Sequence, residues 1–555
     1  MNVNTKFKSS LFALCSCLYL TACSSSNGVD EVTVDSVSLR WNNYFRAYNN
    51  TTGVVDPLAD LRIYQVMVES FQNGDDTINY NVGYGPSDHK GDLQGIINAI
   101  PYIKSLGMNA IWLTPIFESA KENDSNPSML DATGYYTRDY YKVDRRFGDE
   151  QKLKQLVDTA HANGLYVFLD GVFGHFRSDL NNTSPKGNKV TITQKCLGGE
   201  LTYYTPPEHT SCADFDDKGQ SLAYMKEVAT YYVENFKIDG WRLDQAYQVP
   251  LKDLHEIKTA VEEISSKVTY TNAKGEIVHP LAYLVAEIWA SNPVIAKTAY
   301  GYKKDEGLDS AFDFGMRYPI VQALATEEWM KADHSGFRLA EGLAYNENNL
   351  PRHALPNLMI TNHDLLRFGD LIQRAGLQDT YNERVILALS YLAIVHSGPI
   401  TNYYGEEIGQ EVPNYANRVE TMGYRDDHVA RDNGKIKDFT PQEEHFKKLF
   451  TFLMNLRANH GSLSNGRMDL LKVNRELFSI RKSFKGDDDF FYFMNFSKNT
   501  LKITLSKELT TTNAKALTKL SSDGNTEVKK DLEGNFEFTL APLSFALLQN
   551  GEHFE

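Results

Sequence analysis

Short apolar runs alternate with amphipathic segments along most of the chain, from about residue 58 to 455. The apolar runs are rich in β-branched and aromatic residues, as strands are, and the segments between them repeat apolar positions at helical spacing. Eight runs have this character: 61–68, 109–116, 165–172, 238–244, 282–289, 310–314, 357–364 and 400–406. Eight strands separated by helices predict an α/β fold in which a parallel sheet closes into a (β/α)8 TIM barrel.

Two regions depart from this alternation. Residues 173–220, after the third run, are polar and rich in turn-forming residues. A long connection after the C-terminal end of a strand overhangs the barrel mouth, so we expect a loop insertion there. From 456 to 555 the stretches DDFFYFMNFSKNTLKITL and GNFEFTLAPLSFALLQ alternate apolar and polar residues. That period of two predicts a C-terminal antiparallel β domain, which we interpret as a β-sandwich.

The N-terminus has the features of a targeting segment. Lys6 and Lys8 precede the apolar stretch LFALCSCLYLTAC. That stretch is too short to span a bilayer and is typical of the apolar region of a signal peptide. It ends at Leu-Thr-Ala-Cys, which resembles the lipobox of bacterial lipoproteins, whose cysteine is lipidated. An ordinary secretory signal is the alternative.

We therefore expect a signal peptide over residues 1–22, a lipid on Cys23, and a polar tether with a short prefix over 23–57. Ser24, after the cysteine, resembles the class of lipoproteins sorted to the outer membrane. The expected location is the outer membrane, at its periplasmic face or at the cell surface. The N-terminal lipid is the only membrane contact that the sequence predicts.

Charge and cysteine content narrow the function. The formal net charge is -15. It argues against a nucleic-acid partner, because a polyanion would be repelled. Of five cysteines, only Cys196 and Cys212 follow the expected lipidation site. A pair of cysteines in an exported protein predicts a disulfide, which would stabilise the fold by about 3 kcal/mol.

Charged residues follow several of the predicted strands. In a parallel barrel the C-terminal ends of the strands meet at one rim, where active sites form. Burying charges there costs several kcal/mol unless they are paired, so a structural role does not explain the whole set. The residues at strand ends are Asp170, His175, Arg242, Asp244, Glu287, Asn362, His363 and Asp364.

Carboxylates without a catalytic cysteine, a serine motif or a phosphate-binding glycine loop indicate glycosidic chemistry. A retaining glycosidase needs one ionised carboxylate as nucleophile and one protonated carboxyl as acid. Arg242, two residues before Asp244, would keep that carboxylate ionised. Glu287 lies within VAEIW, and apolar neighbours favour a protonated carboxyl.

At these residues the chain resembles the α-amylase family, glycoside hydrolase family 13. Four segments match the four signature regions of that family in order: DGVFGH (170–175), GWRLD (240–244), EIW (287–289) and NHD (362–364). GMNAIWLTPIF and GYYTRDYYKVDRRFG match the second strand and the segment after it. The resemblance runs from about Leu61 into the C-terminal β domain.

The resemblance implies a role for each matching residue. Asp244 would be the nucleophile, Glu287 the general acid/base and Asp364 the transition-state stabiliser. A second group would bind the sugar or support the nucleophile. In it, His175 and His363 hydrogen-bond the sugar, Tyr135 stacks on it, and Arg242 orients Asp244 and pairs with Asp170.

The expected activity is retaining hydrolysis of α-1,4-glucosidic bonds in starch-type polysaccharides or malto-oligosaccharides. A cyclomaltodextrinase, a neopullulanase or an α-glucosyltransferase is the alternative, because all share the covalent intermediate. A non-catalytic glucan-binding lipoprotein is disfavoured, since such proteins lose the catalytic acids. We expect a monomer without an organic cofactor.

Calcium is the one cofactor that the resemblance raises. The family commonly has an asparagine, a calcium ligand, where this chain has Gly174, and Asp214 resembles another ligand position. The oxygen-rich loop 72–81 is a separate candidate, through Asn73, Asp75 and Asn79. A plain polar loop is the competing interpretation.

A second departure follows the nucleophile. Many α-amylases have Lys-His three and four residues after it, whereas this chain has Tyr247 and Gln248. The difference loosens the assignment to starch-type endo-hydrolysis and leaves room for a relative that cleaves cyclodextrins or oligosaccharides.

Overall fold

The computed structural model describes residues 29–40, 46, 51–82, 86–121, 124, 127–198, 209–412, 429–510, 518–521 and 528–552. The expected signal peptide and Cys23 lie outside these residues, so their assignment stays a prediction. Within the described ranges, none of the helices combines the length and apolar character needed to cross a membrane.

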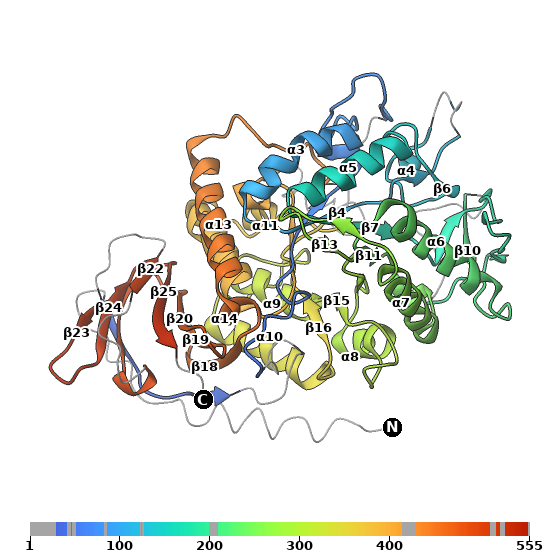
Figure 1. Ribbon diagram of the computed structural model, residues 1–555. Helices are drawn as coiled ribbons and strands as arrows, with labels where there is room; N and C mark the ends of the chain where they lie inside the picture. The colour runs from blue at the N-terminus through green and yellow to red at the C-terminus, as the bar shows by residue number, and fades with distance from the viewer. Residues whose placement is uncertain are drawn as a thin grey trace, which may run out of the picture.

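Eight parallel strands form the centre of the molecule (Figure 1). They are β3 (Arg62–Val66), β4 (Ala110–Leu113), β7 (Tyr166–Gly171), β11 (Gly240–Leu243), β14 (Tyr283–Ala286), β15 (Ser310–Phe312), β16 (Leu355–Asn357) and β17 (Ile400–Tyr403). A parallel bridge between Leu358 and Ile400 joins the last two and nearly closes the ring. The predicted barrel is confirmed, and each predicted run contains or overlaps one strand.

The seventh strand differs from its predicted span of 357–364. It covers only Leu355–Asn357, so His363 and Asp364 lie in the loop beyond it. The side chain of Asn362 accepts the backbone N–H of Asp364 at 2.9 Å. This local turn takes the chain out of the extended conformation before the functional residues.

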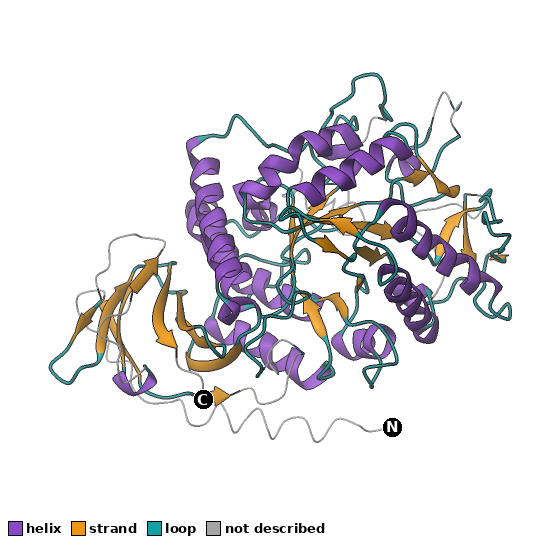
Figure 2. Cartoon of the chain, in the orientation of Figure 1, coloured by secondary structure: helices purple, strands orange, loops and turns teal. Residues whose placement is uncertain are grey.

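Helices cover the outside of the barrel (Figure 2). In α5 (Glu150–Ala162), Leu153, Leu156, Val157 and Ala160 are buried, which is the one-sided spacing that the sequence predicts. The other helices are α2 (Val68–Phe71), α3 (Leu93–Ser105), α4 (Met129–Ala132), α6 (Gln220–Phe236), α7 (Leu251–Ser265), α8 (Asn292–Ile295), α9 (Phe314–Leu324), α10 (Gly336–Asn349), α11 (Phe368–Arg374), α12 (Tyr381–Ser390), α13 (Pro441–Asn459) and α14 (Gly461–Ser464).

The expected insertion follows β7. It contains a three-stranded antiparallel sheet of β8 (His175–Arg177), β10 (Thr210–Ala213) and β9 (Ile192–Thr193). The disulfide between Cys196 and Cys212 is confirmed, with a Cα–Cα distance of 5.4 Å across a sequence separation of 16.

The C-terminal domain consists of two packed sheets, in the order β2-β18-β19-β20-β25-β22 and β1-β21-β24-β23. The strands of the first sheet are β2 (Leu39–Arg40), β18 (Arg467–Val473), β19 (Leu477–Ser483), β20 (Asp488–Asn495), β25 (Phe545–Glu552) and β22 (Thr518–Ser521). Those of the second are β1 (Val29–Val34), β21 (Thr500–Leu505), β24 (Phe536–Leu540) and β23 (Lys529–Lys530).

Alternate residues of β20 face two different cores. Phe491 and Phe493 pack between the two sheets, whereas Phe490, Tyr492 and Met494 belong to the core of the barrel. Successive strand residues point to opposite faces, so this one strand joins both cores. The C-terminal domain is therefore packed against the barrel, with α10 and α14 in contact with β19.

Part of the predicted tether is ordered structure. Val29–Val34 forms β1 and pairs in parallel with β21, and Leu39 and Arg40 pair with β18. These two strands lie within the stretch predicted as a tether and short prefix, and they belong to the C-terminal sheets. The physical reason is that Val32 and Val34 alternate with polar residues and pack into the core between the two sheets.

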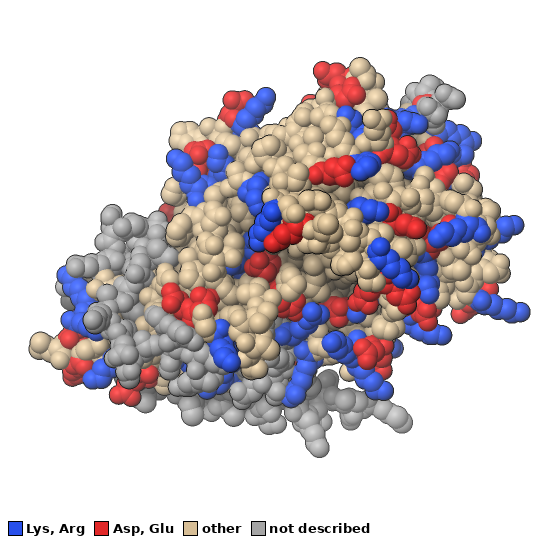
Figure 3. Space-filling view, in the orientation of Figure 1, with Lys and Arg blue, Asp and Glu red and all other residues tan. Residues whose placement is uncertain are grey.

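Acidic and basic side chains lie intermingled on the face seen in Figure 3. A mixed distribution of this kind is typical of a solvated surface.

Candidate active site

The predicted functional residues meet at the C-terminal rim of the barrel. Asp170 is in β7 and Arg242 in the neighbouring β11, and the two are paired in register. Asp244 follows β11 directly, and Glu287 follows β14. Neighbouring parallel strands in register direct equivalent side chains to the same place, which explains why residues 74 positions apart in the sequence share one site.

A single guanidinium organises the carboxylates. Nη1 of Arg242 donates to both oxygens of Asp170, at 2.8 and 3.0 Å, and to Oδ1 of Asp244 at 2.7 Å. Its Nη2 lies 3.9 Å from Oε2 of Glu287. Burial of Arg242 lowers its pKa, but the neighbouring acids, Asp170 foremost, outweigh that effect and keep the group charged. One fixed positive charge therefore serves three carboxylates.

Asp244 has one oxygen held and one left open. Oδ1 accepts from Arg242, whereas among the described residues Oδ2 accepts no hydrogen bond. Nε2 of His175 lies 3.9 Å from Oδ2. A carboxylate that is oriented through one oxygen and free at the other has the geometry of a nucleophile.

Glu287 lies in a different environment. Burial raises its pKa to about 8, with Arg242 opposing the shift and Asp244 and Asp364 adding to it. Its Oε2 accepts the backbone N–H of Gln245 at 3.0 Å. Two neighbouring carboxyls, one paired with arginine and the other held protonated near neutral pH, have the complementary states that acid catalysis with a nucleophile requires.

Asp364 is paired with an arginine that the sequence motifs do not contain. Nη2 of Arg431 donates to Oδ1 of Asp364 at 2.9 Å, and Nε of Arg431 donates to the carbonyl of His363 at 3.1 Å. Burial raises the pKa of Asp364, but His363, Arg431 and Arg242 outweigh it and lower the net value. The side chain is 32% exposed, so this carboxylate remains open to a ligand.

His363 and Tyr135 form a stacked pair beside Asp170. The Tyr135 hydroxyl donates to Oδ2 of Asp170 at 2.8 Å and lies 2.7 Å from Nε2 of His363. The two rings are nearly parallel, with centroids 5.3 Å apart. Burial lowers the pKa of His363 to about 3, so this imidazole is neutral. The stacking of Tyr135 on a sugar stays a prediction, because its ring packs on His363 here.

Two further polar residues of the site, Gln65 and Arg431, were not predicted from the sequence. Nε2 of Gln65, in β3, lies 2.6 Å from Nδ1 of His363. The sequence feature that could have identified Gln65 is a glutamine inside the strand RIYQV. No sequence feature identified Arg431, because it lies outside the barrel strands and their motifs.

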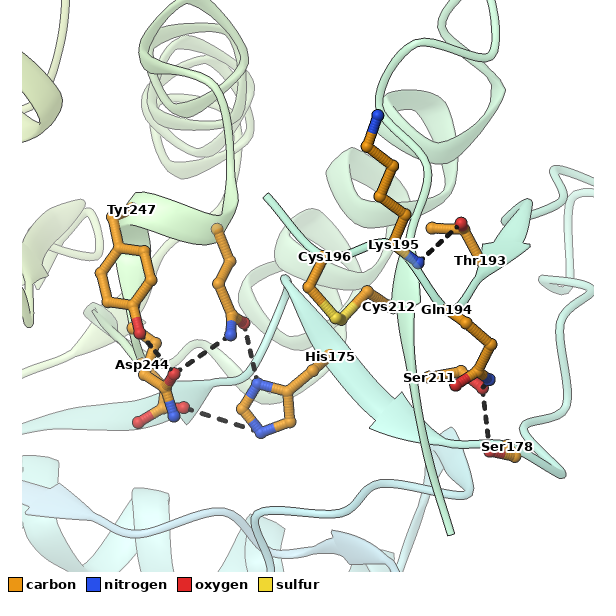
Figure 4. The surroundings of a disulfide bond; sticks show 12 residues. His175, Ser178, Thr193, Gln194, Lys195, Cys196, Ser211, Cys212, Asp244 and Tyr247 are labelled. Atoms are coloured by element: carbon orange, nitrogen blue, oxygen red, sulfur yellow. Dashed lines mark hydrogen bonds and ion pairs between the residues drawn. A yellow bond between two sulfur atoms is a disulfide. The ribbon is translucent and has the colours of Figure 1, made fainter. Parts of the chain in front are cut away.

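The third side of the site is built from the insertion. His175 begins β8, and its Nδ1 lies 2.9 Å from Oε1 of Gln248. Gln248 ends the short 3-10 helix η1 (Ala246–Gln248), which follows Asp244. Figure 4 shows His175, Tyr247 and Asp244 beside the disulfide between Cys196 and Cys212.

The predicted calcium ligands in loop 72–81 are engaged within their own loop. The amide of Asn73 donates to Asp76 at 2.8 Å, and Oδ1 of Asp75 accepts from the hydroxyl of Thr77 at 2.6 Å. Hydrogen bonds from Thr77 lower the pKa of Asp75. Asn79 is partly exposed nearby. In the part of the chain that the structure describes, His, Cys, Asp and Glu form no group of three arranged to hold a metal ion.

The position suggested by the family resemblance fits calcium poorly. Gly174 has no side-chain oxygen, and Asp214 accepts the backbone N–H of Asp216 in its own turn at 3.0 Å. These residues do not make a calcium site.

Comparison with known proteins agrees with this geometry. The family model described as "Alpha amylase, catalytic domain" matches residues 65–191 and 199–457. A cyclomaltodextrinase of Thermoanaerobacter pseudethanolicus is 27% identical over 465 residues, 79% of this chain and 71% of the relative. Neopullulanase 2 of Thermoactinomyces vulgaris is 28% identical over 374 residues, 62% of this chain and 56% of the relative.

Among solved structures, AmyP in complex with maltose is 42% identical, with a TM-score of 0.80 over 90% of this chain and 98% of that chain. The family model covers well over half of the sequence and contains the whole rim described above, from Gln65 to Arg431. The chain therefore belongs to the alpha-amylase family and is a glycoside hydrolase.

Proposed function

We propose that the protein hydrolyses α-1,4-glucosidic bonds in malto-oligosaccharides and starch fragments with retention of configuration. The observation that carries the proposal is the shared guanidinium of Arg242, which holds Asp244 at 2.7 Å and lies 3.9 Å from Glu287. Retaining enzymes need a nucleophile and an acid close together, about 5–5.5 Å apart.

In the first step, Oδ2 of Asp244 attacks the anomeric carbon while Glu287 gives its proton to the leaving glycosidic oxygen. A carbon–oxygen bond to Asp244 forms, the glycosidic bond breaks, and the shortened glucan departs with the proton. The raised pKa of Glu287 supplies that proton near neutral pH. Arg242 holds the other oxygen of Asp244, which fixes the direction of attack.

In the second step, Glu287, now ionised, takes a proton from water. The hydroxide attacks the same anomeric carbon, the ester to Asp244 breaks, and the sugar leaves with its original configuration. Asp364 carries negative charge beside the site and stabilises the positive charge that develops on the sugar ring in both steps. Arg431 and Arg242 hold that carboxylate in its ionised form.

The substrate class is supported by the relatives. The solved structure quoted above is a complex with maltose, and the curated relatives carry the names cyclomaltodextrinase and neopullulanase. Ring-opening hydrolysis of cyclodextrins is thus the second candidate, and transfer to a sugar acceptor the third. Separate incubations with starch, pullulan, β-cyclodextrin and maltoheptaose, with all products resolved, distinguish them: rapid loss of starch iodine colour favours endo-hydrolysis, and preferential ring opening favours the second candidate.

The Asp244→Asn variant tests the mechanism. Removing the nucleophile should lower kcat on maltoheptaose by about ten-thousandfold or more, with an unchanged melting temperature. Asp305→Asn, at an exposed position, is the matched control and should retain full activity. Turnover by Asp244→Asn at the rate of that control would overturn the assignment.

We also propose that the chain is exported as a monomeric lipoprotein anchored through Cys23. The lipobox-like segment and the disulfide support this location, because disulfides persist in oxidising compartments. Cys23→Ser should move the protein from the membrane fraction to the soluble fraction.

Calcium binding by loop 72–81 is a separate proposal: calcium should raise the melting temperature of the wild type but not of Asp75→Ala.

A further inference from the structure

Two positions at which this chain departs from its family lie in contact. Gly174 precedes His175, and Gln248 ends η1. A Cβ atom built on Gly174 would lie 2.3 Å from Cβ and 2.5 Å from Oε1 of Gln248. Those distances are far below any real carbon contact, so a side chain at 174 and the present position of Gln248 exclude each other. The glycine and the glutamine are sterically complementary.

The amide of Gln248 has a defined orientation. Nε2 of Gln248 and the hydroxyl of Tyr247 both donate to Oε1 of Gln245, at 3.0 and 2.8 Å. A carbonyl oxygen only accepts, so the amino group of Gln248 must face Gln245. Its carbonyl oxygen then faces Nδ1 of His175 at 2.9 Å, which must carry the proton. Nε2 of His175 is left to face Asp244.

The same relay reaches the acid/base. The backbone N–H of Gln245 donates to Oε2 of Glu287 at 3.0 Å. A series of hydrogen bonds thus links His175, beside Asp244, through the side chain of Gln248 and then Gln245 to Glu287. Asp244 and Glu287 each lie next to a residue of this hydrogen-bonded series, Asp244 next to His175 and Glu287 next to Gln245.

The insertion closes onto the same short helix. Cys212 is paired in register with His175, and the backbone N–H of Ala213 donates to the carbonyl of Gly174 at 3.1 Å. Beyond the disulfide, a Cβ on Gly198 would lie 2.4 Å from the ring of Tyr247. The disulfide-closed segment therefore packs on η1, and η1 holds His175.

We propose that Gln248 is a positioning residue, which holds the His175 ring with Nε2 towards Asp244 and the reacting sugar. The Gln248–Gly174 contact and the disulfide fasten the insertion to the rim at the place where the family resemblance suggests a calcium ligand. The kinetic part of this proposal rests on the proposed hydrolysis of malto-oligosaccharides.

Gln248→Met and Gln248→Glu test the relay against wild type on maltoheptaose. Methionine keeps the volume but not the hydrogen bonds, and should lower kcat by about tenfold while KM changes less than about twofold. Glutamate keeps an acceptor for Nδ1 of His175 and should retain clearly more of kcat than methionine. Gln220→Met, at an exposed position where the insertion ends, is the matched control.

Two outcomes would overturn the positioning role. One is an unchanged kcat in Gln248→Met. The other is equal losses in the methionine and glutamate variants with a parallel fall in melting temperature, which is the behaviour of a purely structural residue.

A second experiment needs no activity. Gly174→Asn should lower the melting temperature by several degrees, and adding Gln248→Gly, which removes the Cβ 2.3 Å away, should regain most of that loss because the clash is relieved. Strictly additive losses would refute the steric complementarity.

Treatment with EDTA followed by calcium tests whether a metal holds the insertion on the rim. If EDTA removes activity and calcium restores it, in Asp75→Ala as in the wild type, the proposal that the insertion is held without a metal is refuted. If the wild type leaves maltoheptaose intact, the proposed function fails while the thermal test of Gly174→Asn still stands.

Discussion

The two histidines of the rim are held in opposite ways. Nδ1 of His363 lies 2.6 Å from the amino group of Gln65, whereas Nδ1 of His175 lies 2.9 Å from the carbonyl oxygen of Gln248. Tyr135 donates its hydroxyl proton to Asp170, so its oxygen accepts from Nε2 of His363. His363 therefore donates through Nε2, whereas His175 donates through Nδ1.

The difference gives the two flanks of the site different chemistry. Nε2 of His363 lies 3.3 Å from Asp364, while its N–H donates to the Tyr135 hydroxyl. Nε2 of His175 lies 3.9 Å from the open oxygen of Asp244, so a sugar hydroxyl can bridge the two groups. Two residues of one type thus have separate functions because a glutamine amide is turned one way or the other.

The flanks also differ in origin. The His363 flank is built from β3, the loop after β16 and the segment around Arg431, all within the barrel. The His175 flank depends on the insertion and on η1, where the chain departs from its family. Gly174 and Gln248, the two departures that lie in contact, both belong to the His175 flank.

The largest effect is expected on the barrel flank. Arg431→Met removes a charge-assisted hydrogen bond to Asp364, and kcat/KM for maltoheptaose should fall by about 100-fold. Arg475→Met is the control, since Arg475 is an exposed arginine with a distant acidic partner. Equal kinetics in the two variants would show that Arg431 does not support Asp364.

A tautomer test separates the flanks more sharply. Gln65→Met should lower kcat by about tenfold, because His363 loses the donor to Nδ1. Gln65→Glu should be worse than Gln65→Met, since a carboxylate opposite Nδ1 demands a proton there. At position 248 the order is reversed, with glutamate better than methionine. The same order at both positions, in steady-state kinetics, would contradict opposite tautomers.

The smallest effect concerns Glu287, which lies between the flanks. Its folded pKa of about 8 lies above its ordinary value of 4.5, so the folded protein binds more protons than the unfolded chain between those values. Wild-type stability contributed by this group is complete at low pH and is lost as the pH rises towards 8. Glutamine does not titrate, so the Glu287→Gln variant does not lose stability in this way as the pH rises.

The melting temperature of Glu287→Gln minus that of the wild type should therefore increase from pH 5 to pH 8, by about a few degrees. Thermal unfolding at several pH values measures it, with Glu234→Gln, on the exposed surface of α6, as the control. A difference that is constant with pH would mean that Glu287 is not protonated in the folded enzyme near neutral pH.

Much of this architecture is determined by local patterns. The alternation of strands and helices, the one-sided apolar spacing of α5 and the period of two in β20 each depend on neighbours in the sequence, so they were predictable. Asp244 and Glu287, the proposed nucleophile and acid, were found for a related reason: each directly follows an apolar strand, and the barrel topology implies where such residues meet.

Other features depend on residues far apart in the chain. Val29–Val34 looked like part of a polar tether because its partner, β21, begins at Thr500. Arg431 carries no motif, yet it bonds to Asp364, 67 positions earlier. No local pattern encodes such pairings.

By itself, the sequence determined the barrel, the insertion, the family and the acids at the rim, since each follows from spacing within short segments. Only the tertiary structure decided which ring nitrogen of each histidine donates a hydrogen bond and which arginine pairs with Asp364. It also decided that Gln248 occupies the space beside Gly174. Hydrogen-bond direction and steric fit depend on distances between atoms, which exist only once the distant segments are packed together.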